Sequence, residues 1–154
     1  KAEMEEAASI AQATEFIEEK RKKYDSPIAQ GGTNVSGGQK QRLSIARAIA
    51  KKPDVFIFDD SFSALDCKTD VTLRAALKER TQDSTVIIVA QRISTILHAE
   101  QIIVLDEGRI AGIGTHKELL KNCDAYYQIA SSQWSEKELA GDMGTTGKEE
   151  MAHA

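Results

Sequence analysis

The sequence has no long apolar run, only two cysteines and no strong excess of either charge. Its longest apolar stretches are 55–58, 86–90 and 102–105, far short of the roughly 18 to 20 residues that a membrane-spanning helix needs. Cys67 and Cys123 stand apart without CxxC spacing, which favours free thiols in a reducing compartment over a disulfide framework. A net charge of −4 gives no support for non-specific nucleic-acid binding, which depends on Lys and Arg facing phosphates.

The size and the two ends of the sequence set the next limits. A chain of 154 residues with 41% apolar content is long enough for one domain, or for part of a larger one. It starts at Lys1 rather than at Met, and we therefore expect a piece of a longer polypeptide. The apolar periodicity is lost after Trp134, and residues 141–154 are expected to form a mobile polar tail.

Helical and strand patterns alternate along the chain. Helices are expected at 2–23, 37–51, 71–80, near 94–99 and after Thr115, and strands at 55–58, 85–90, 101–105 and 110–113. Turn residues at 106–109 predict a hairpin, and Thr115 with Glu118 forms a predicted capping box. His98 and His116 are expected on helix surfaces, and Trp134 is expected to close a small apolar patch.

This alternation predicts an α/β layered fold with a largely parallel sheet. The strands at 55–58 and 85–90 are apolar except for Thr85, a pattern typical of strands buried on both faces. Ligands of such sheets bind just beyond the carboxyl ends of the strands. Asp59 and Asp60 follow directly after residues 55–58 and are therefore candidate functional residues.

A second candidate site is the stretch Ser36-Gly37-Gly38-Gln39. Ser36 and Gln39 have the spacing of a capping box at the start of a helix. Two glycines in a first helical turn each cost about 0.5–1 kcal/mol relative to alanine. They leave bare N–H groups at the positive end of the helix dipole, where phosphate binds well. Taken alone, this stretch could serve as a simple helix cap or as a phosphate-binding site.

In order along the chain, SGGQKQR, an apolar helix, VFIFDD, SALD and TVIIVAQRISTI resemble the second half of the nucleotide-binding domain of an ATP-binding cassette (ABC) ATPase. Residues 102–110 with 114–116 resemble the C-terminal hairpin and helix of exporter-type cassettes. The resemblance covers roughly residues 3–130. It implies an α/β fold that is part of a P-loop NTPase domain, with a mainly parallel sheet flanked by helices, part of the helical signature subdomain, and a C-terminal β-hairpin and helix.

The resemblance also implies roles for individual residues, with ATP and Mg²⁺ as cofactors. The signature residues that would contact ATP held by the opposite subunit of a head-to-tail dimer are Ser36, Gly37, Gly38 and Gln39. Asp59 would help to hold Mg²⁺, as the aspartate of the Walker B strand, and its hard oxygen ligands suit that ion. Ser63 and Asp66 belong to a stretch that resembles the D-loop at the dimer seam, although ordinary turn chemistry alone could also explain them.

Three departures from the family pattern bear on function. The sequence contains no GxxxxGK[ST] P-loop, whose backbone and lysine cradle the phosphates. Asp60 stands where the family usually has a catalytic glutamate and is one methylene shorter. Gln91 stands where the family has the switch histidine, and glutamine cannot be cationic or move a proton at neutral pH.

The combination of an altered acid (Asp60), an altered switch residue (Gln91) and an intact signature resembles the pattern of the helper subunit in a heterodimeric ABC exporter. In that reading the chain's own site is degenerate, and its signature completes the hydrolytic site of a second nucleotide-binding domain. Transmembrane domains would contact it through coupling helices at the cytoplasmic face of the cell membrane, and no nucleic-acid partner is expected. The alternatives are a homodimeric exporter half with a slow but active Asp60 site, or a non-transport ABC ATPase of translation or DNA repair.

The same resemblance suggests a division of the chain into three parts. Residues 1–52 would be part of the helical signature subdomain, and residues 53–134 the C-terminal part of the ATPase core. Residues 135–154 would form the polar tail. The fragment, having no P-loop of its own, is not expected to hydrolyse ATP alone.

Overall fold

The computed structural model describes residues 1–135, 139 and 141 and divides the chain into two compact units, Lys1–Val89 and Ala90–Ala154. Apart from residues 135, 139 and 141, the predicted tail at 135–154 lies outside the described residues. No helix in the described ranges is both long enough and apolar enough to cross a membrane.

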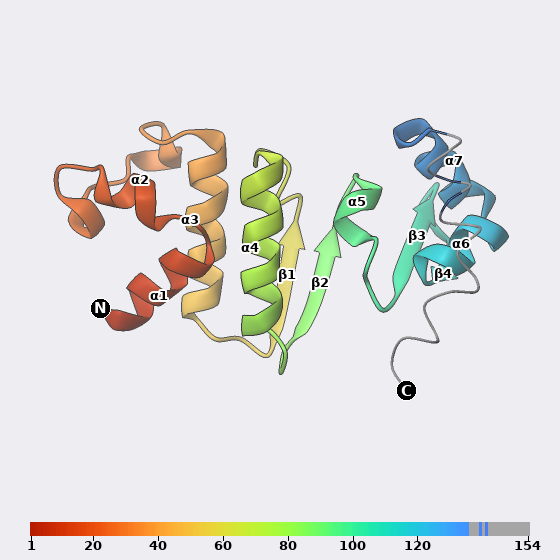
Figure 1. Cartoon of the computed structure of the whole chain (residues 1–154), viewed down its shortest axis with the longest axis horizontal. Helices are drawn as coiled ribbons and strands as arrows, with labels where there is room; N and C mark the ends of the chain where they lie inside the picture. Colours follow the sequence, from red (N-terminus) through yellow and green to blue (C-terminus); the bar gives the residue numbers. More distant parts are fainter. Residues whose placement is uncertain (136–138, 140, 142–154) are drawn as a thin grey trace. The chain divides into compact units, whose positions relative to one another are not determined.

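The first unit combines a helical part with two parallel strands (Figure 1). Its helices are α1 (Ala2–Ile10), α2 (Thr14–Glu18), α3 (Gly37–Ala50) and α4 (Cys67–Arg80), with short 3₁₀ turns η1 (Lys23–Asp25) and η2 (Gln30–Gly32). Strand β1 (Val55–Asp59) pairs in parallel with β2 (Thr85–Val89), from Val55 opposite Thr85 to Asp59 opposite Val89. Helix α4 makes the crossover between them, as parallel strands require, and the predicted α/β class is confirmed.

The single helix expected at 2–23 is wrong, because the chain leaves the helical conformation at Gln12. Gln12 has a φ of 55°, the left-handed conformation that ends many helices. The Ala13 amide donates to the Ala8 carbonyl at 2.8 Å and the Gln12 amide to the Ser9 carbonyl at 3.0 Å, the two bonds of a Schellman motif. Helix periodicity did not reveal this stop because the motif here has glutamine instead of the usual glycine.

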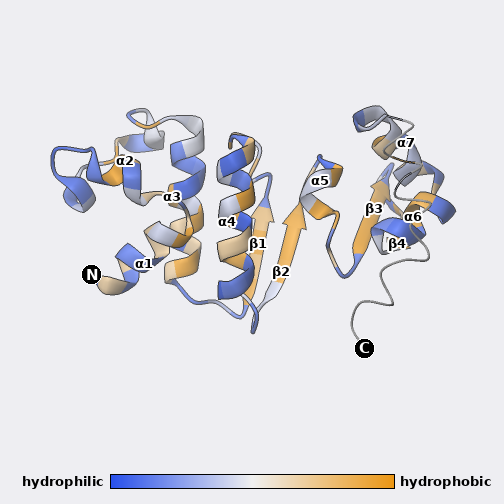
Figure 2. Ribbon diagram, viewed as in Figure 1, coloured by the Kyte–Doolittle hydropathy of each residue, from blue (hydrophilic) through white to orange (hydrophobic). Residues whose placement is uncertain are grey.

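Strands β1 and β2 are apolar along their length (Figure 2), but in this chain only one face of β1 is buried. Phe56 and Phe58 are 4% and 3% exposed and share a core with Ile45 and Ile49 of α3 and Leu73 and Leu77 of α4. On the opposite face Ile57 is 69% exposed and Val89, on β2, 53% exposed. The expectation of strands buried on both faces is therefore wrong for the described residues, because helices cover only one face of this pair.

The second unit is built on a hairpin. Its elements are α5 (Ile93–Ile96), β3 (Ile102–Asp106), β4 (Arg109–Gly114), α6 (His116–Asn122) and α7 (Asp124–Gln133). β3 and β4 pair antiparallel, with a register shift between Val104 and Leu105. Glu107 and Gly108 have φ values of 45° and 75°, as a two-residue type I′ turn requires, so the hairpin prediction is confirmed.

The helix predicted after Thr115 starts as expected, with both bonds of its capping box present. Two helices follow instead of one, because Cys123 is extended (φ −132°, ψ 103°) between α6 and α7. His116 is 5% exposed, so its expected place on a helix surface is wrong. Its Nδ1 lies 2.8 Å from the Tyr126 hydroxyl, and its ring meets Trp134 edge-on, which places Trp134 in the apolar cluster as expected.

Candidate functional site

The amino-terminal turn of α3 is built by a reciprocal capping box. The Ser36 hydroxyl accepts from the Gln39 amide at 3.2 Å, and the Gln39 side-chain carbonyl accepts from the Ser36 amide at 3.1 Å. The Lys40 amide donates to the Ser36 carbonyl. Within the described part of the chain, the amides of Gly37 and Gly38 have no acceptor, as expected for the first donors of a helix. Capping and anion binding are thus compatible here, since they use different donors.

The two glycines of this turn differ in their surroundings. A Cβ added at Gly37 would lie 3.7 Å from the Ala64 Cβ, which is ordinary contact. A Cβ added at Gly38 would lie 2.9 Å from the Ala64 carbonyl oxygen, closer than side chains tolerate. The sequence explained both glycines by access to the backbone, but Gly38 also permits a close approach between α3 and the loop after β1.

Asp59 and Asp60 lie at the carboxyl end of the parallel strand pair, where ligands of such sheets bind. Both are exposed. Asp60 has a φ of 48°, a left-handed conformation that is uncommon for a residue with a Cβ. Its amide donates to the Val89 carbonyl at 3.1 Å, so the end of β2 helps to hold this conformation.

Gln41 is a residue that the sequence did not single out. Its side-chain amide donates to the Asp60 carbonyl at 3.0 Å and lies 3.1 Å from the Ser63 hydroxyl. Its side-chain carbonyl accepts from the Ala64 amide at 2.9 Å. Because these partners follow Gln41 by about 20 residues, no local pattern could have revealed the connection. The only sequence signal is its place one turn beyond the glycines.

The two candidate residues after β1 are held by local bonds. The Ser63 hydroxyl donates to the Asp60 carbonyl at 3.1 Å. The Asp66 carboxylate caps α4, accepting from the Thr69 amide at 2.9 Å and from the Thr69 hydroxyl at 2.6 Å. The Thr69 hydroxyl and amide lower the pKa of Asp66 below its ordinary value. This cap starts α4 at Cys67, earlier than the position 71 that periodicity predicted.

Gln91 belongs to the second unit, whereas the other candidate residues belong to the first. Its carbonyl accepts from the Gln133 side chain at 2.7 Å, and the same side chain accepts from the Ile93 amide at 2.9 Å. The structure therefore brings Ser36–Gln39, Asp60, Ser63 and Ala64 into one neighbourhood. Gln91 lies two residues before α5, in the second unit.

The donor set fits the implied cofactors in part. The described residues contain no group of three or more His, Cys, Asp or Glu side chains that could enclose a metal. Mg²⁺ often takes only one or two carboxylates from a protein. Asp59 alone would therefore be sufficient if phosphate oxygens and water supplied the remaining ligands. The open amides of Gly37 and Gly38 fit a phosphate.

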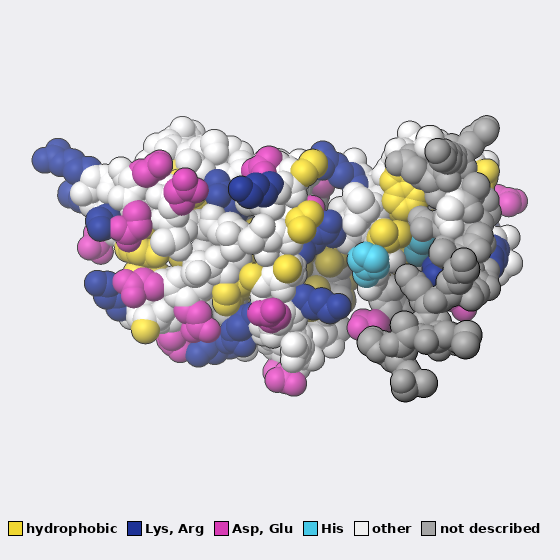
Figure 3. All heavy atoms as spheres, viewed as in Figure 1, with side chains coloured by type: hydrophobic (Ala, Val, Ile, Leu, Met, Phe, Trp, Pro, Cys, Tyr) yellow, Lys and Arg dark blue, Asp and Glu magenta, His cyan; other side chains and the backbone are white. Residues whose placement is uncertain are grey.

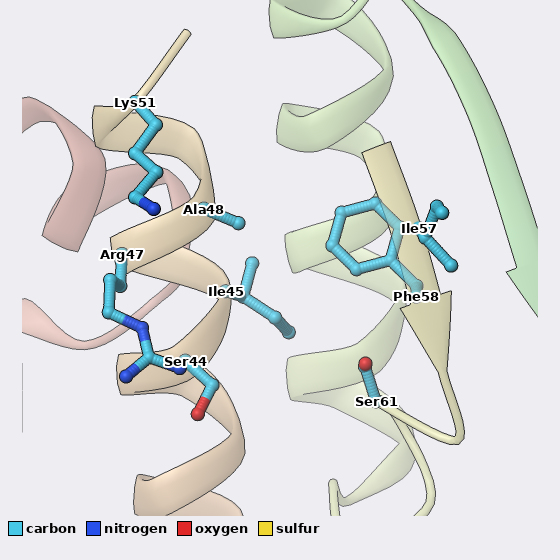
Figure 4. Close-up of a pocket in the computed structure, with 8 residues that line it drawn as sticks. All are labelled: Ser44, Ile45, Arg47, Ala48, Lys51, Ile57, Phe58 and Ser61. Carbon is cyan, nitrogen blue, oxygen red and sulfur yellow. The ribbon is translucent and has the colours of Figure 1, made fainter. Parts of the chain in front are cut away.

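A cavity of about 320 Å³ lies between α3 and β1 (Figure 4). Residues of α3 and β1, together with Lys51 and Ser61, line it. None of the predicted site residues does, although Phe58 and Ser61 flank Asp59 and Asp60 in the sequence. Acidic and basic side chains are interspersed over the α1–α3 region on the face shown in Figure 3.

Comparison with known proteins identifies relatives of this chain by sequence and by fold. Residues 1–63 match the ABC transporter family. The chain is 47% identical over 131 residues to an uncharacterized ABC transporter ATP-binding protein of Mycobacterium tuberculosis, covering 85% of this chain and 22% of that protein. It is 44% identical to the ATP-dependent lipid A-core flippase of Haemophilus influenzae, with 84% of this chain and 22% of that protein covered.

A solved structure of a bacterial Atm1-family ABC exporter with ATP bound has the same fold. Its TM-score is 0.82 at 36% identity, over 86% of this chain and 23% of that one. The chain thus spans about a fifth of the length of the relatives that it matches. These residues thus have the sequence and the fold of the ATP-binding domain of ABC transporters of the exporter type.

Proposed function

We propose that this chain acts in an ABC exporter as a nucleotide-binding domain whose own site is degenerate. Its signature, Ser36–Gln39, completes the hydrolytic site of a second nucleotide-binding domain in a head-to-tail heterodimer. Transmembrane domains contact it through coupling helices at the cytoplasmic face of the membrane. The activity of the whole protein belongs to this proposal, because the chain spans only 22% of the relatives' length.

The observation that carries the proposal is the pairing of an intact signature turn with an altered acid. The capping box holds Ser36 and Gln39 in place, and the amides of Gly37 and Gly38 face no acceptor in the part of the chain that the structure describes. A γ-phosphate from the partner would meet these amides at the positive end of a 14-residue helix. The division at residues 52–53 between signature subdomain and ATPase core remains part of the proposal.

Asp60 and Gln91 support the degenerate reading of the chain's own site. Mg²⁺, held with the help of Asp59, would neutralise charge on the phosphates when bound. A general base must reach within about 2.6–3.2 Å of the proton that it takes, directly or through one water. Bonds from Gln41 and Ser63 reach the Asp60 carbonyl, and its amide bonds to Val89. These bonds oppose a backbone shift that would extend the reach of the shorter side chain.

The first test is steady-state ATP hydrolysis by the transporter that contains these residues, carrying Asp60→Asn. This change removes the base and nearly keeps the shape. We expect a rate within about twofold of the parent, because the partner's site performs the turnover. Asp54→Asn, an exposed acid just before β1, is the matched control. A fall of tenfold or more, as expected for losing a general base, would make Asp60 a working catalyst and favour the homodimer.

The complementary variant is Gly37→Glu. It places a bulky anion where the phosphate would approach, and we expect it to abolish ATP hydrolysis by the whole transporter. Since a Cβ at Gly37 would meet only ordinary contact, the protein should still fold, which circular dichroism can check. Full activity in this variant would show that the signature does not serve the working site.

A further inference from the structure

The side chain of Gln41 joins two segments that lie far apart in the sequence. From the second turn of α3 it donates to the Asp60 carbonyl and accepts from the Ala64 amide, at 3.0 and 2.9 Å. It also lies 3.1 Å from the Ser63 hydroxyl. All the hydrogen-bonding groups of one amide side chain are thus directed at a single loop. A glutamine that simply faced solvent on the polar side of α3 would not make these bonds.

The same two segments also touch directly. Gly38 lies against the Ala64 carbonyl, with no room for a Cβ. The loop is further held by the bond from the Ser63 hydroxyl to the Asp60 carbonyl. Because Gln41 bonds to a residue in a left-handed conformation, it helps to stabilise backbone that would relax without such contacts. The turn 36–39 and the loop 60–64 therefore cannot shift relative to each other without breaking these bonds.

We infer that Gln41 is a positioning residue that holds the signature turn, 36–39, and the loop 60–64 as one rigid unit. The inference rests on the proposed function, in which both segments meet the partner domain. A rigid connection brings the Gly37 and Gly38 amides and Ser63 to the dimer seam together. A small misplacement of such groups can cost on the order of 100-fold in rate. A side chain that maintains their alignment therefore affects the rate of hydrolysis.

The first experiment measures this connection without nucleotide. Amide hydrogen exchange is recorded for the segment 60–66 in the parent transporter and in the Gln41→Met variant, which keeps the length and removes every hydrogen bond. We expect exchange in this segment to become roughly fivefold faster or more, since the Ala64 amide loses its acceptor. Gln128→Met, the same substitution at an exposed position of α7, is the control and should leave the segment unchanged.

The second experiment measures ATP hydrolysis by the same variants at a temperature well below unfolding. We expect Gln41→Met to lower kcat roughly tenfold with KM for ATP within about twofold, and Gln128→Met to match the parent. A merely structural role would change the unfolding temperature and the exchange rate but would leave kcat unchanged. If Gln41→Met does not fold, Gln41→Glu replaces it, because a carboxylate still accepts from the Ala64 amide but cannot donate to the Asp60 carbonyl.

Each outcome decides the inference. Faster exchange together with a lower kcat supports it. Faster exchange with an unchanged kcat, a lower kcat with unchanged exchange, or agreement with the control in both measurements would overturn it. The Gly37→Glu variant distinguishes a failure of the role of Gln41 from a failure of the proposed function. If that variant abolishes hydrolysis while Gln41→Met behaves as the control, the signature assignment stands and the role of Gln41 fails.

Discussion

Gly37 and Gly38 are adjacent in the sequence, yet replacing each by alanine should affect stability in opposite directions. Alanine is favoured over glycine in a helix by about 0.5–1 kcal/mol. At Gly37 the new Cβ finds ordinary contact at 3.7 Å, so this gain should remain. Gly37→Ala should therefore be neutral or stabilising by up to about 1 kcal/mol.

At Gly38 the same methyl group meets a fixed obstacle. It would lie 2.9 Å from the Ala64 carbonyl oxygen, about 0.5 Å inside the 3.4 Å at which ordinary contact begins. The obstacle cannot turn away as a flexible side chain would, because the Ala64 amide is bonded to Gln41 and the Leu65 amide to the Phe62 carbonyl. Overpacking typically costs 1–3 kcal/mol, which exceeds the gain in helix propensity. We expect Gly38→Ala to destabilise by about 1–2 kcal/mol.

The assay is urea denaturation of the two purified variants beside the parent, with the midpoint and the slope fitted separately. The two variants add the same methyl group one residue apart, so each controls for the other. If Gly38→Ala proves as stable as Gly37→Ala, the close approach between α3 and the loop 60–64 is wrong, and access to the backbone alone explains both glycines.

Two further predictions concern buried and titrating groups. Tyr126→Phe removes the hydroxyl that contacts His116 and should destabilise by about 1–2 kcal/mol, measured by thermal unfolding; no loss would mean that this contact contributes nothing. Hydrogen bonds from Thr69 and from Thr115 lower the pKa of Asp66 and of Glu118. The stability that these carboxylates contribute is present above their unfolded-state pKa values and is lost as pH falls through the lowered folded-state values. Asp66→Asn combined with Glu118→Gln should therefore show a shallower acid loss of stability, and an unchanged profile would contradict this.

Much of the local structure could be predicted because it depends on neighbouring residues. Capping boxes at Ser36 and Thr115 depend on side chains three residues apart, and the turn at Glu107–Gly108 depends on two adjacent residues. The strand before Asp59 is recognisable because its residues are apolar and its end is acidic. The Schellman stop at Gln12 was missed because glutamine rarely occupies that conformation.

The sequence by itself therefore determined the fold class and the order of the strands, since these follow from periodicity, and its short motifs indicated the family. Only the tertiary structure decided which contacts hold the site together. The bonds of Gln41 to the loop 60–64, the approach of Gly38 to Ala64 and the burial of His116 join residues distant in sequence or depend on packing. The exposure of one face of β1 also depends on packing. Apolar residues indicate a surface suited to burial, but only the neighbouring elements decide whether that face is covered.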